Sequence, residues 1–203
     1  MNPRRGERFG TLPNFLTLLR IVFVPALILI GMSVSGNTGT FGNRFLSFCG
    51  GLVILLAAIS DVLDGYLARK WKSVSRWGVL FDPLADKLVV LTALVMLIPL
   101  DRGVPAWAVA LFIIREMAVT CLRGFAASEE IFIEAAELGK SKVTLQYFAL
   151  GLIFLYYPYF GVNWHAVGLV FFWLALPVTL LSGVVYFYRF FKEDDERRKR
   201  TGA

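Results

Sequence analysis

Six long apolar stretches divide this chain, and each is close to the length that a helix needs to cross about 30 Å of hydrocarbon at about 1.5 Å per residue. Hydrophobic residues make up 57% of the 203 residues and charged residues only 18%, which is more apolar than a soluble domain of this size. We therefore expect an all-α, polytopic membrane protein with six transmembrane helices. They are predicted at residues 14–35, 43–71, 79–100, 105–125, 138–160 and 164–190.

No internal repeat, linker or low-complexity tract interrupts the chain, so residues 1–203 are predicted to form a single membrane domain. Residues 4–9 form a short basic segment that we expect at the membrane interface. The first apolar stretch contains Pro25, which a membrane helix tolerates as a kink, and it lacks the small-residue cleavage pattern of a signal peptide. It is therefore expected to remain as a helix.

The placement of basic residues predicts the orientation. With six crossings, the loops near residues 36–42, 101–104 and 158–163 lie on one side, and of 21 Lys and Arg only Arg44 and Arg102 lie in or beside these loops. The positive-inside rule then makes both termini cytoplasmic. The same bias explains the net charge of +6, so no nucleic-acid partner is expected.

The two sides of the membrane are predicted to carry different side chains. Residues 192–200, which are mostly charged, are expected to be a solvated tail that also meets anionic lipid. Aromatic residues gather on the opposite side, as in the aromatic belt of a membrane protein, and His165 is expected among them in a structural role. These aromatic residues are Trp107, Tyr156, Tyr157, Tyr159 and Trp164.

Four aspartates, Asp61, Asp64, Asp82 and Asp86, lie at the facing ends of the second and third apolar stretches. Residue counting places all four just inside the cytoplasmic edge of the membrane. The first two are three positions apart and the last two are four apart, so each pair shares one helix face. Because ionisable residues at membrane depth are costly and usually functional, the four together indicate a site.

Four carboxylates brought close together cannot all stay ionised without cations, because like charges raise one another's pKa. A carboxylate set without His or Cys favours Mg²⁺ or Mn²⁺ over Zn²⁺. A pair of such ions is a common means of clamping a phosphoryl group during displacement. The aspartates therefore predict a metal site for phosphoryl transfer.

The residues around the aspartates suit a nucleotide diphosphate. Gly65 and Gly78 leave no side chain where a flat base or a diphosphate must approach the backbone. Arg69 and Lys70, at the end of the second predicted helix, can bind phosphate oxygens. The alternative for the glycines is a purely structural role as small residues at helix crossings.

The complete pattern resembles the signature of the CDP-alcohol phosphatidyltransferase family at every defined position. It is Asp61-x2-Asp64-Gly65-x2-Ala68-Arg69-x8-Gly78-x3-Asp82-x3-Asp86. Further segments, at residues 13–20, 81–87, 115–123 and 138–142, are similar to the bacterial members that make phosphatidylglycerophosphate, and the resemblance covers about residues 11–190. It departs after Lys142, where Val143 stands in place of the usual Thr.

The resemblance implies a role for each residue of the motif. Asp61, Asp64 and Asp82 would bind two Mg²⁺ or Mn²⁺ ions, and Asp86 would complete the second metal's shell and act as the general base. A pocket for the CDP group would be lined by Asn14, Thr17, Gly65, Ala68, Arg69 and Gly78.

The resemblance also implies the reaction. A hydroxyl of an acceptor alcohol attacks the β-phosphate of CDP-diacylglycerol and expels CMP, in a phosphotransferase of phospholipid biosynthesis. The implied location is the bacterial inner (cytoplasmic) membrane with a cytoplasmic active site. The implied partners are CDP-diacylglycerol, the acceptor and membrane lipids, and relatives suggest a homodimer.

Four basic residues on the fourth and fifth predicted helices indicate an acceptor that bears a phosphate, and the resemblance favours sn-glycerol 3-phosphate. They are Arg115, Arg123, Lys140 and Lys142. Arg115 is the deepest, so we expect it to face a polar cavity or to pair with an acid such as Glu116. As an alternative, the arginines are structural counter-charges and the lysines follow the positive-inside rule. Arg20, Lys87 and Arg189 are predicted only to orient the protein.

Two other functions are compatible with parts of the sequence. The same chemistry with another acceptor, such as inositol phosphate or serine, stays open because the acceptor pocket is visible only as a few cations. A cation transporter would predict acids spread through the membrane depth and often an inverted repeat. Here the acids are confined to one side and no repeat is visible.

Overall fold

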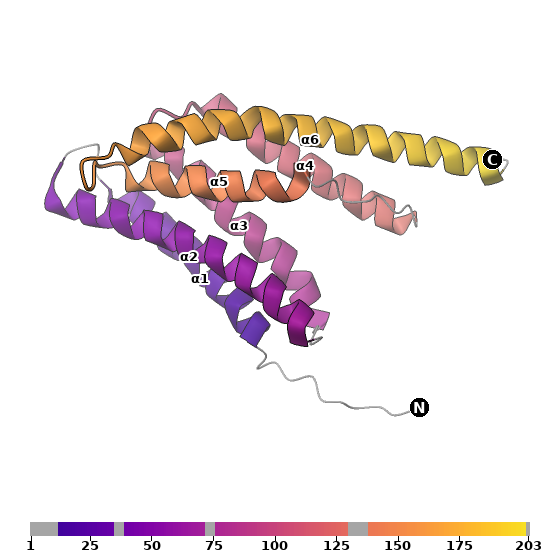
Figure 1. Ribbon diagram of the computed structural model, residues 1–203, viewed down its shortest axis with the longest axis horizontal. Helices are drawn as coiled ribbons and strands as arrows, with labels where there is room; N and C mark the ends of the chain where they lie inside the picture. Colours follow the sequence, from indigo (N-terminus) through magenta and orange to yellow (C-terminus); the bar gives the residue numbers. More distant parts are fainter. Residues whose placement is uncertain (1–11, 35–38, 72–75, 130–137, 202–203) are drawn as a thin grey trace.

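The structure is a computed structural model that describes residues 12–34, 39–71, 76–129 and 138–201. Within these ranges, side chains are described except at residues 12–17, 64–71, 76–83, 86, 138–142, 198, 200 and 201. The described residues form six α-helices and no β-strand, which confirms the predicted all-α class (Figure 1). The helices are α1 (Leu12–Ser33), α2 (Phe41–Trp71), α3 (Arg76–Leu100), α4 (Ala106–Ser128), α5 (Leu138–Leu155) and α6 (Trp164–Thr201).

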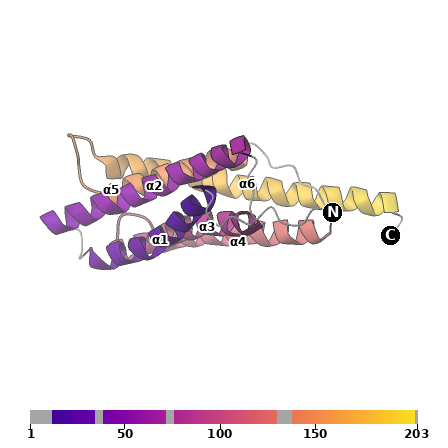
Figure 2. The same ribbon diagram turned by 90° about the horizontal axis from the view of Figure 1, so that it is seen from below.

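The helices form an elongated bundle with two distinct ends (Figure 1). The connecting end comprises residues 39–44, 101–105 and 156–163, next to the starts of α2, α4 and α6. The site end is the opposite one, where α1, α3 and α5 begin and α2 ends. Figure 2 shows α2 beside α5, and it shows α6 extending beyond the other helices.

Apolar packing holds the bundle together. α1 packs against α2 and α3, α5 packs against α2 and α6, and α4 packs mainly against α6. The core includes nearly fully buried side chains from five helices: Leu27, Ile54, Leu94, Phe112 and Ile153. Large apolar side chains are also exposed on every helix, for example Leu29, Leu55, Ile98, Ile114, Phe148 and Leu181. Soluble proteins rarely expose so much apolar surface, whereas lipid covers it in a membrane protein.

Two of the described helices are long and apolar enough to cross a membrane, judged by length and composition. The segments are Phe41–Leu63 within α2 and Trp164–Arg197 within α6. Shorter apolar segments occur at Leu18–Ser33, Lys87–Leu100 and Val143–Leu155. These helices fit a membrane protein, and the crossing by all six stays a prediction.

Most helix ends lie within three residues of the predicted ones, and two differ by five residues or more. α5 ends at Leu155 rather than at residue 160, because Tyr156 has a φ of 56°, outside the helical region. α6 continues to Thr201 rather than ending at residue 190, so the predicted solvated tail is exposed but helical. An ion pair between Lys199 and Asp195, four residues apart, supports this extension.

Glycines allow α2 and α5 to approach closely. A Cβ atom at Gly51 would lie 2.9 Å from the Leu155 side chain and 3.1 Å from the carbonyl oxygen of Gly151. Close crossings at small residues are typical of packed membrane helices. A larger residue at position 51 would therefore push the two helices apart.

Arg102 holds the connecting end together. Its side chain, which is 1% exposed, donates hydrogen bonds to the carbonyl oxygens of Ile153 (3.2 Å) and Phe154 (2.6 Å) and to Ser47 Oγ (2.6 Å). The two carbonyls belong to the last turn of α5, where unpaired carbonyls and the helix dipole attract a cation. Burial lowers the pKa of Arg102 to about 10, so the guanidinium is still charged at neutral pH.

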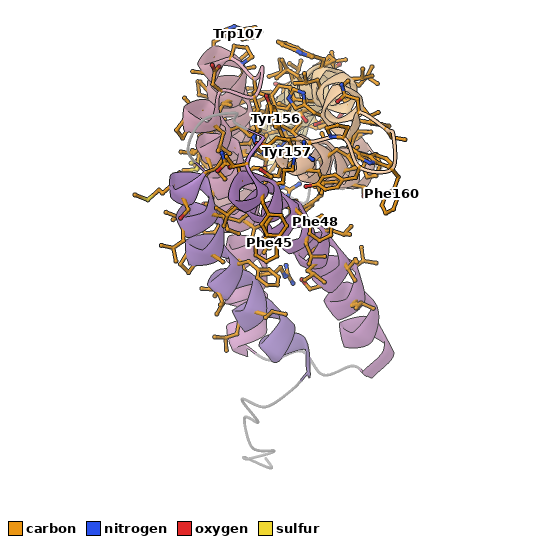
Figure 3. All side chains as sticks on the ribbon, turned by 90° about the vertical axis from the view of Figure 1, so that its left-hand side faces the viewer. Phe45, Phe48, Trp107, Tyr156, Tyr157 and Phe160 are labelled. Carbon is orange, nitrogen blue, oxygen red and sulfur yellow. The ribbon has the colours of Figure 1, made fainter. Side chains whose placement is uncertain are left out.

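Aromatic side chains gather at the connecting end, where Figure 3 labels Trp107, Tyr156 and Tyr157, and the rings of Phe154 and Tyr156 lie against the Arg102 guanidinium. The Arg102 guanidinium lies 4.7 Å from the ring centroid of Tyr156, and His165 Nε2 lies 3.0 Å from the Arg102 carbonyl oxygen. Trp164 donates a hydrogen bond to the carbonyl oxygen of Tyr159. The predicted gathering of aromatic residues at this end is confirmed, and His165 has the structural contacts expected of it.

Candidate active site

The four aspartates of the motif lie on two helices at the site end. Asp61 and Asp64 are in the last third of α2, Asp82 and Asp86 are in the first half of α3, and the backbone is helical at all four positions, as their spacing predicts. The members of each pair are about one turn apart and share a helix face. Of the four side chains, only that of Asp61 is among those described. The close approach of the α2 carboxylates to the α3 carboxylates therefore stays a prediction.

Asp61 is bound by a buried arginine from another helix. Arg20 Nη1 on α1 lies 3.1 Å from Asp61 Oδ1, and the two side chains are 1% and 37% exposed. A buried guanidinium requires a partner, so this ion pair fastens α1 to the motif. The sequence predicts only an orienting charge at Arg20, and the one available signal was its position inside an apolar stretch.

The ion pair is compatible with a metal-binding role for Asp61. A carboxylate offers about four lone-pair positions on its two oxygens, so a hydrogen bond from Arg20 to Oδ1 does not use the group completely. Hydrogen bonds of this kind orient the carboxylate ligands of metal sites.

A groove of about 410 Å³ runs along the outside of the bundle between α2 and α5. Its walls are almost entirely apolar, and they include Leu52, Leu55, Tyr147, Phe148 and Leu152. Asp61, Val62, Val143 and Thr144 lie at the site end of the groove. The structure therefore places one aspartate of the motif at the end of an apolar groove.

Arg115, which is 8% exposed, connects α4 to α6. Its Nη1 lies 2.7 Å from Glu116 Oε1, Nε donates to the carbonyl oxygen of Thr179 (3.0 Å), and Nη2 donates to Ser182 Oγ (2.7 Å). A Cβ at Gly183 would lie 3.1 Å from Arg115 Cγ, so the lack of a side chain there gives the arginine room. The expected pairing of Arg115 with Glu116 is confirmed.

The other predicted acceptor residues are only partly described. Arg123, two turns along α4 from Arg115, lies over the ring of Tyr186 on α6 at 5.3 Å. The structure thus brings Arg115 and Arg123 to the same α4–α6 interface. Lys140 and Lys142 are in the first turn of α5, and their side chains lie outside the described set. A role of these four residues in binding acceptor phosphate stays a prediction.

A second polar network joins α3 and α4 and lies next to α5. Lys87 Nζ on α3 donates a hydrogen bond to Thr120 Oγ1 on α4, and Thr120 Oγ1 donates to the Glu116 carbonyl oxygen (2.6 Å). Beside it is a cavity of about 20 Å³, lined by Lys87, Val90, Leu91, Glu116, Val143 and Gln146. Sequence reasoning missed Gln146 and gave Lys87 only an orienting charge, because neither lies in a motif that predicts its partner.

The remaining predicted residues are placed by their backbone alone. Those expected around a CDP group lie on α1, α2 and α3 at the site end, with side chains outside the described set: Asn14, Thr17, Gly65, Ala68, Arg69 and Gly78. Among the described side chains, no group of three or more His, Cys, Asp or Glu is arranged to hold a metal ion. Three of the four predicted metal ligands are not in that set.

Comparisons with known proteins agree with the motif. Residues 10–181 match the sequence profile of the CDP-alcohol phosphatidyltransferase family. The chain is 36% identical over 177 residues to the CDP-diacylglycerol–glycerol-3-phosphate 3-phosphatidyltransferase of Rickettsia typhi, covering 87% of this chain and 94% of that protein. It is 35% identical over 181 residues to the Bacillus subtilis enzyme of the same name, covering 87% and 93% of the two chains. The Haemophilus influenzae enzyme of that name is 31% identical over 182 residues, covering 86% and 90%.

Proposed function

The chain belongs to the CDP-alcohol phosphatidyltransferase family, and we propose that it transfers the phosphatidyl group of CDP-diacylglycerol to sn-glycerol 3-phosphate, giving phosphatidylglycerophosphate and CMP. The observation that carries the proposal is the similarity to enzymes named for this reaction over 86–87% of the chain. The protein is then a transferase of phospholipid biosynthesis.

All six helices cross the membrane in this proposal, with the termini and the site end on the cytoplasmic side of a bacterial inner membrane. The exposed apolar side chains on each helix support the crossings. The orientation follows from the positive-inside rule, because among the residues that the structure describes Arg44 and Arg102 are the only Lys or Arg at the connecting end. A homodimer is also proposed, by resemblance to the family, and native mass spectrometry in detergent measures it.

The donor lipid occupies the groove between α2 and α5. Its apolar walls suit an acyl chain, and Asp61 at the site end of the groove lies where the diphosphate must be held. From Phe48 to Asp61 the groove follows about 20 Å of helix at about 1.5 Å per residue. That length exceeds the half-thickness of about 15 Å of the hydrocarbon core, so an acyl chain from the cytoplasmic leaflet fits within it.

The motif residues fit a site for two Mg²⁺ or Mn²⁺ ions. Asp61, Asp64, Asp82 and Asp86 supply only hard oxygen ligands, the set that these cations prefer, and Arg20 orients the Asp61 carboxylate. When bound, such ions neutralise charge on the diphosphate. The CDP group lies against Gly65 and Gly78, with Arg69 near its phosphates and Asn14, Thr17 and Ala68 completing the pocket.

Asp86 acts as the general base of the transfer. It accepts the proton of the acceptor hydroxyl while the hydroxyl oxygen forms a bond to the β-phosphorus of the donor. The bond between that phosphorus and the bridging oxygen breaks, and CMP leaves. Arg123, Lys140 and Lys142 bind the acceptor phosphate, and Arg115 fixes α4 against α6.

A CMP-release assay tests this function. Purified protein receives CDP-diacylglycerol and Mg²⁺ or Mn²⁺, with glycerol 3-phosphate, inositol phosphate or serine offered in turn, and the lipid product is identified by mass spectrometry. We expect phosphatidylglycerophosphate with glycerol 3-phosphate and background release with the others. Turnover with another acceptor but none with glycerol 3-phosphate would reject the proposed function while retaining the family's chemistry.

A further inference from the structure

The cavity among α3, α4 and α5 has the size of one small polar group. Its volume is about 20 Å³. A cavity needs roughly 10–15 Å³ of such volume to hold a single water molecule. It therefore accepts one hydroxyl group or one water, and it is too small for a phosphate or a sugar.

The lining of the cavity offers both hydrogen-bond donors and an acceptor. Gln146 is 4% exposed, and its Nε2 has no hydrogen-bond partner among the described residues. A buried amide donor left unpaired is costly, so a ligand that accepts a hydrogen bond there is favoured. Glu116 supplies a carboxylate oriented by Arg115, and Lys87 supplies an ammonium group already hydrogen-bonded to Thr120. A hydroxyl that accepts from Gln146 and donates to Glu116 satisfies this set.

The cavity lies next to both parts of the proposed reaction. Val143 on α5 lines the cavity and also lines the groove that ends at Asp61. Lys87 directly follows Asp86, the proposed general base, on α3. A molecule with one hydroxyl in the cavity is therefore close to the site end of the donor groove.

We propose that this cavity is a subsite for the acceptor hydroxyl that is not phosphatidylated. For glycerol 3-phosphate this is the secondary hydroxyl at C2, which receives a hydrogen bond from Gln146 and gives one to Glu116. Arg115 is a positioning residue that orients Glu116. The inference rests on the proposed function, and it makes Gln146 and Glu116 determinants of specificity for a polyol phosphate.

The test is a double-mutant cycle in which one change removes the Gln146 amide and the other removes the C2 hydroxyl of the substrate. The wild type and Gln146→Leu are each assayed with glycerol 3-phosphate and with 3-hydroxypropyl phosphate, which lacks the C2 hydroxyl. For the wild type we expect kcat/KM about 10-fold lower with the analogue, as for the loss of one buried hydrogen bond. For Gln146→Leu we expect about a 10-fold loss with glycerol 3-phosphate and less than about a 2-fold loss with the analogue. Equal losses with both acceptors would overturn the subsite and leave a structural water in the cavity.

Two controls make the cycle decisive. Asn43→Leu also removes a buried amide, at the connecting end, and we expect it to change kcat/KM for both acceptors by the same factor. The second control is the KM for CDP-diacylglycerol, which should be unchanged in Gln146→Leu. If the folded yield of Gln146→Leu is low, Gln146→Met is used in its place. If the wild type makes no product from glycerol 3-phosphate, the proposed function and the subsite both fail. If the wild type is active and the cycle shows no coupling, only the subsite fails.

Discussion

The two ends of the bundle bury arginines with different partners. At the connecting end, Arg102 binds two helix-terminal carbonyls and a hydroxyl, and aromatic rings cover it. At the site end, Arg20 pairs with Asp61. Arg115, near the middle of α4, pairs with Glu116. The two carbonyls lie at the end of a helix, whereas Asp61 lines the groove and Glu116 lines the cavity.

The difference indicates a division between stability and function. A cation that closes a helix end contributes to folding, and its removal leaves buried carbonyls without donors. A cation that orients a carboxylate leaves the second oxygen able to act on a ligand. We therefore expect changes at the connecting end to lower stability and changes at the site end to lower activity.

The largest effect is expected for Asp86→Asn. Removal of a general base lowers rates by about 10²–10⁴-fold, and the variant should fold with an unchanged thermal midpoint. Single-turnover CMP release and a thermal melt in detergent measure the two quantities. Binding of CDP should persist, and activity within a few-fold of the wild type would show that Asp86 is not the base.

The next effect is expected at the opposite end, for Arg102→Met. Removal of the guanidinium leaves the carbonyls of Ile153 and Phe154 and the Ser47 hydroxyl with one donor fewer, and we expect a loss of about 3 kcal/mol in unfolding free energy. Chemical denaturation in detergent measures this loss. Arg44→Met is the matched control, because Arg44 lies at the same end but is exposed, and it should cost less than about 1 kcal/mol. Equal costs for the two variants would contradict the comparison.

A smaller effect on activity is expected for Arg20→Met. The Asp61 carboxylate loses the group that orients it, so the concentration of Mg²⁺ needed for half-maximal activity should rise about 10-fold or more. A titration of initial rate against Mg²⁺ measures the change. Arg189→Met, which removes an exposed cation from α6, should leave the titration unaltered. An unchanged Mg²⁺ requirement in Arg20→Met would reduce the ion pair to a structural contact.

The smallest effect is expected for Gly51→Ala, midway between the ends. The added methyl meets Leu155 at 2.9 Å and the Gly151 carbonyl oxygen at 3.1 Å, and we expect a loss of about 1–2 kcal/mol in stability. Gly42→Ala lies in the same helix with no atom within 4 Å, so it should be neutral or slightly stabilising. Thermal melts of the pair measure the difference, and a stabilised Gly51→Ala would refute the close crossing.

Local sequence features predicted the helices well. Long apolar stretches and helical spacing gave all six helices and the helical backbone at Asp61, Asp64, Asp82 and Asp86. The end of α5 was missed because Tyr156 adopts a positive φ without the glycine that usually signals it. The extension of α6 was missed although the spacing of Asp195 and Lys199 was a sign of it.

Partners between distant helices could not be predicted from the sequence. The sequence does not specify that Arg20 meets Asp61 rather than lipid headgroups, because the two are 41 residues apart. Gln146 is one amide in an apolar helix, and only its burial beside Lys87 and Glu116 distinguishes it. Arg115 was an exception, because its acid partner is the adjacent residue.

That adjacency bears on how the chain is made. Thr179, which Arg115 binds on α6, is synthesised 64 residues later, and Ser182 follows it. At roughly 5–20 residues per second, the ribosome needs on the order of several seconds to reach them. In the proposed topology, α4 enters the membrane during this interval, before α6 exists. Glu116 is then already present to balance the charge, so the nascent helix brings its own counter-ion into the lipid.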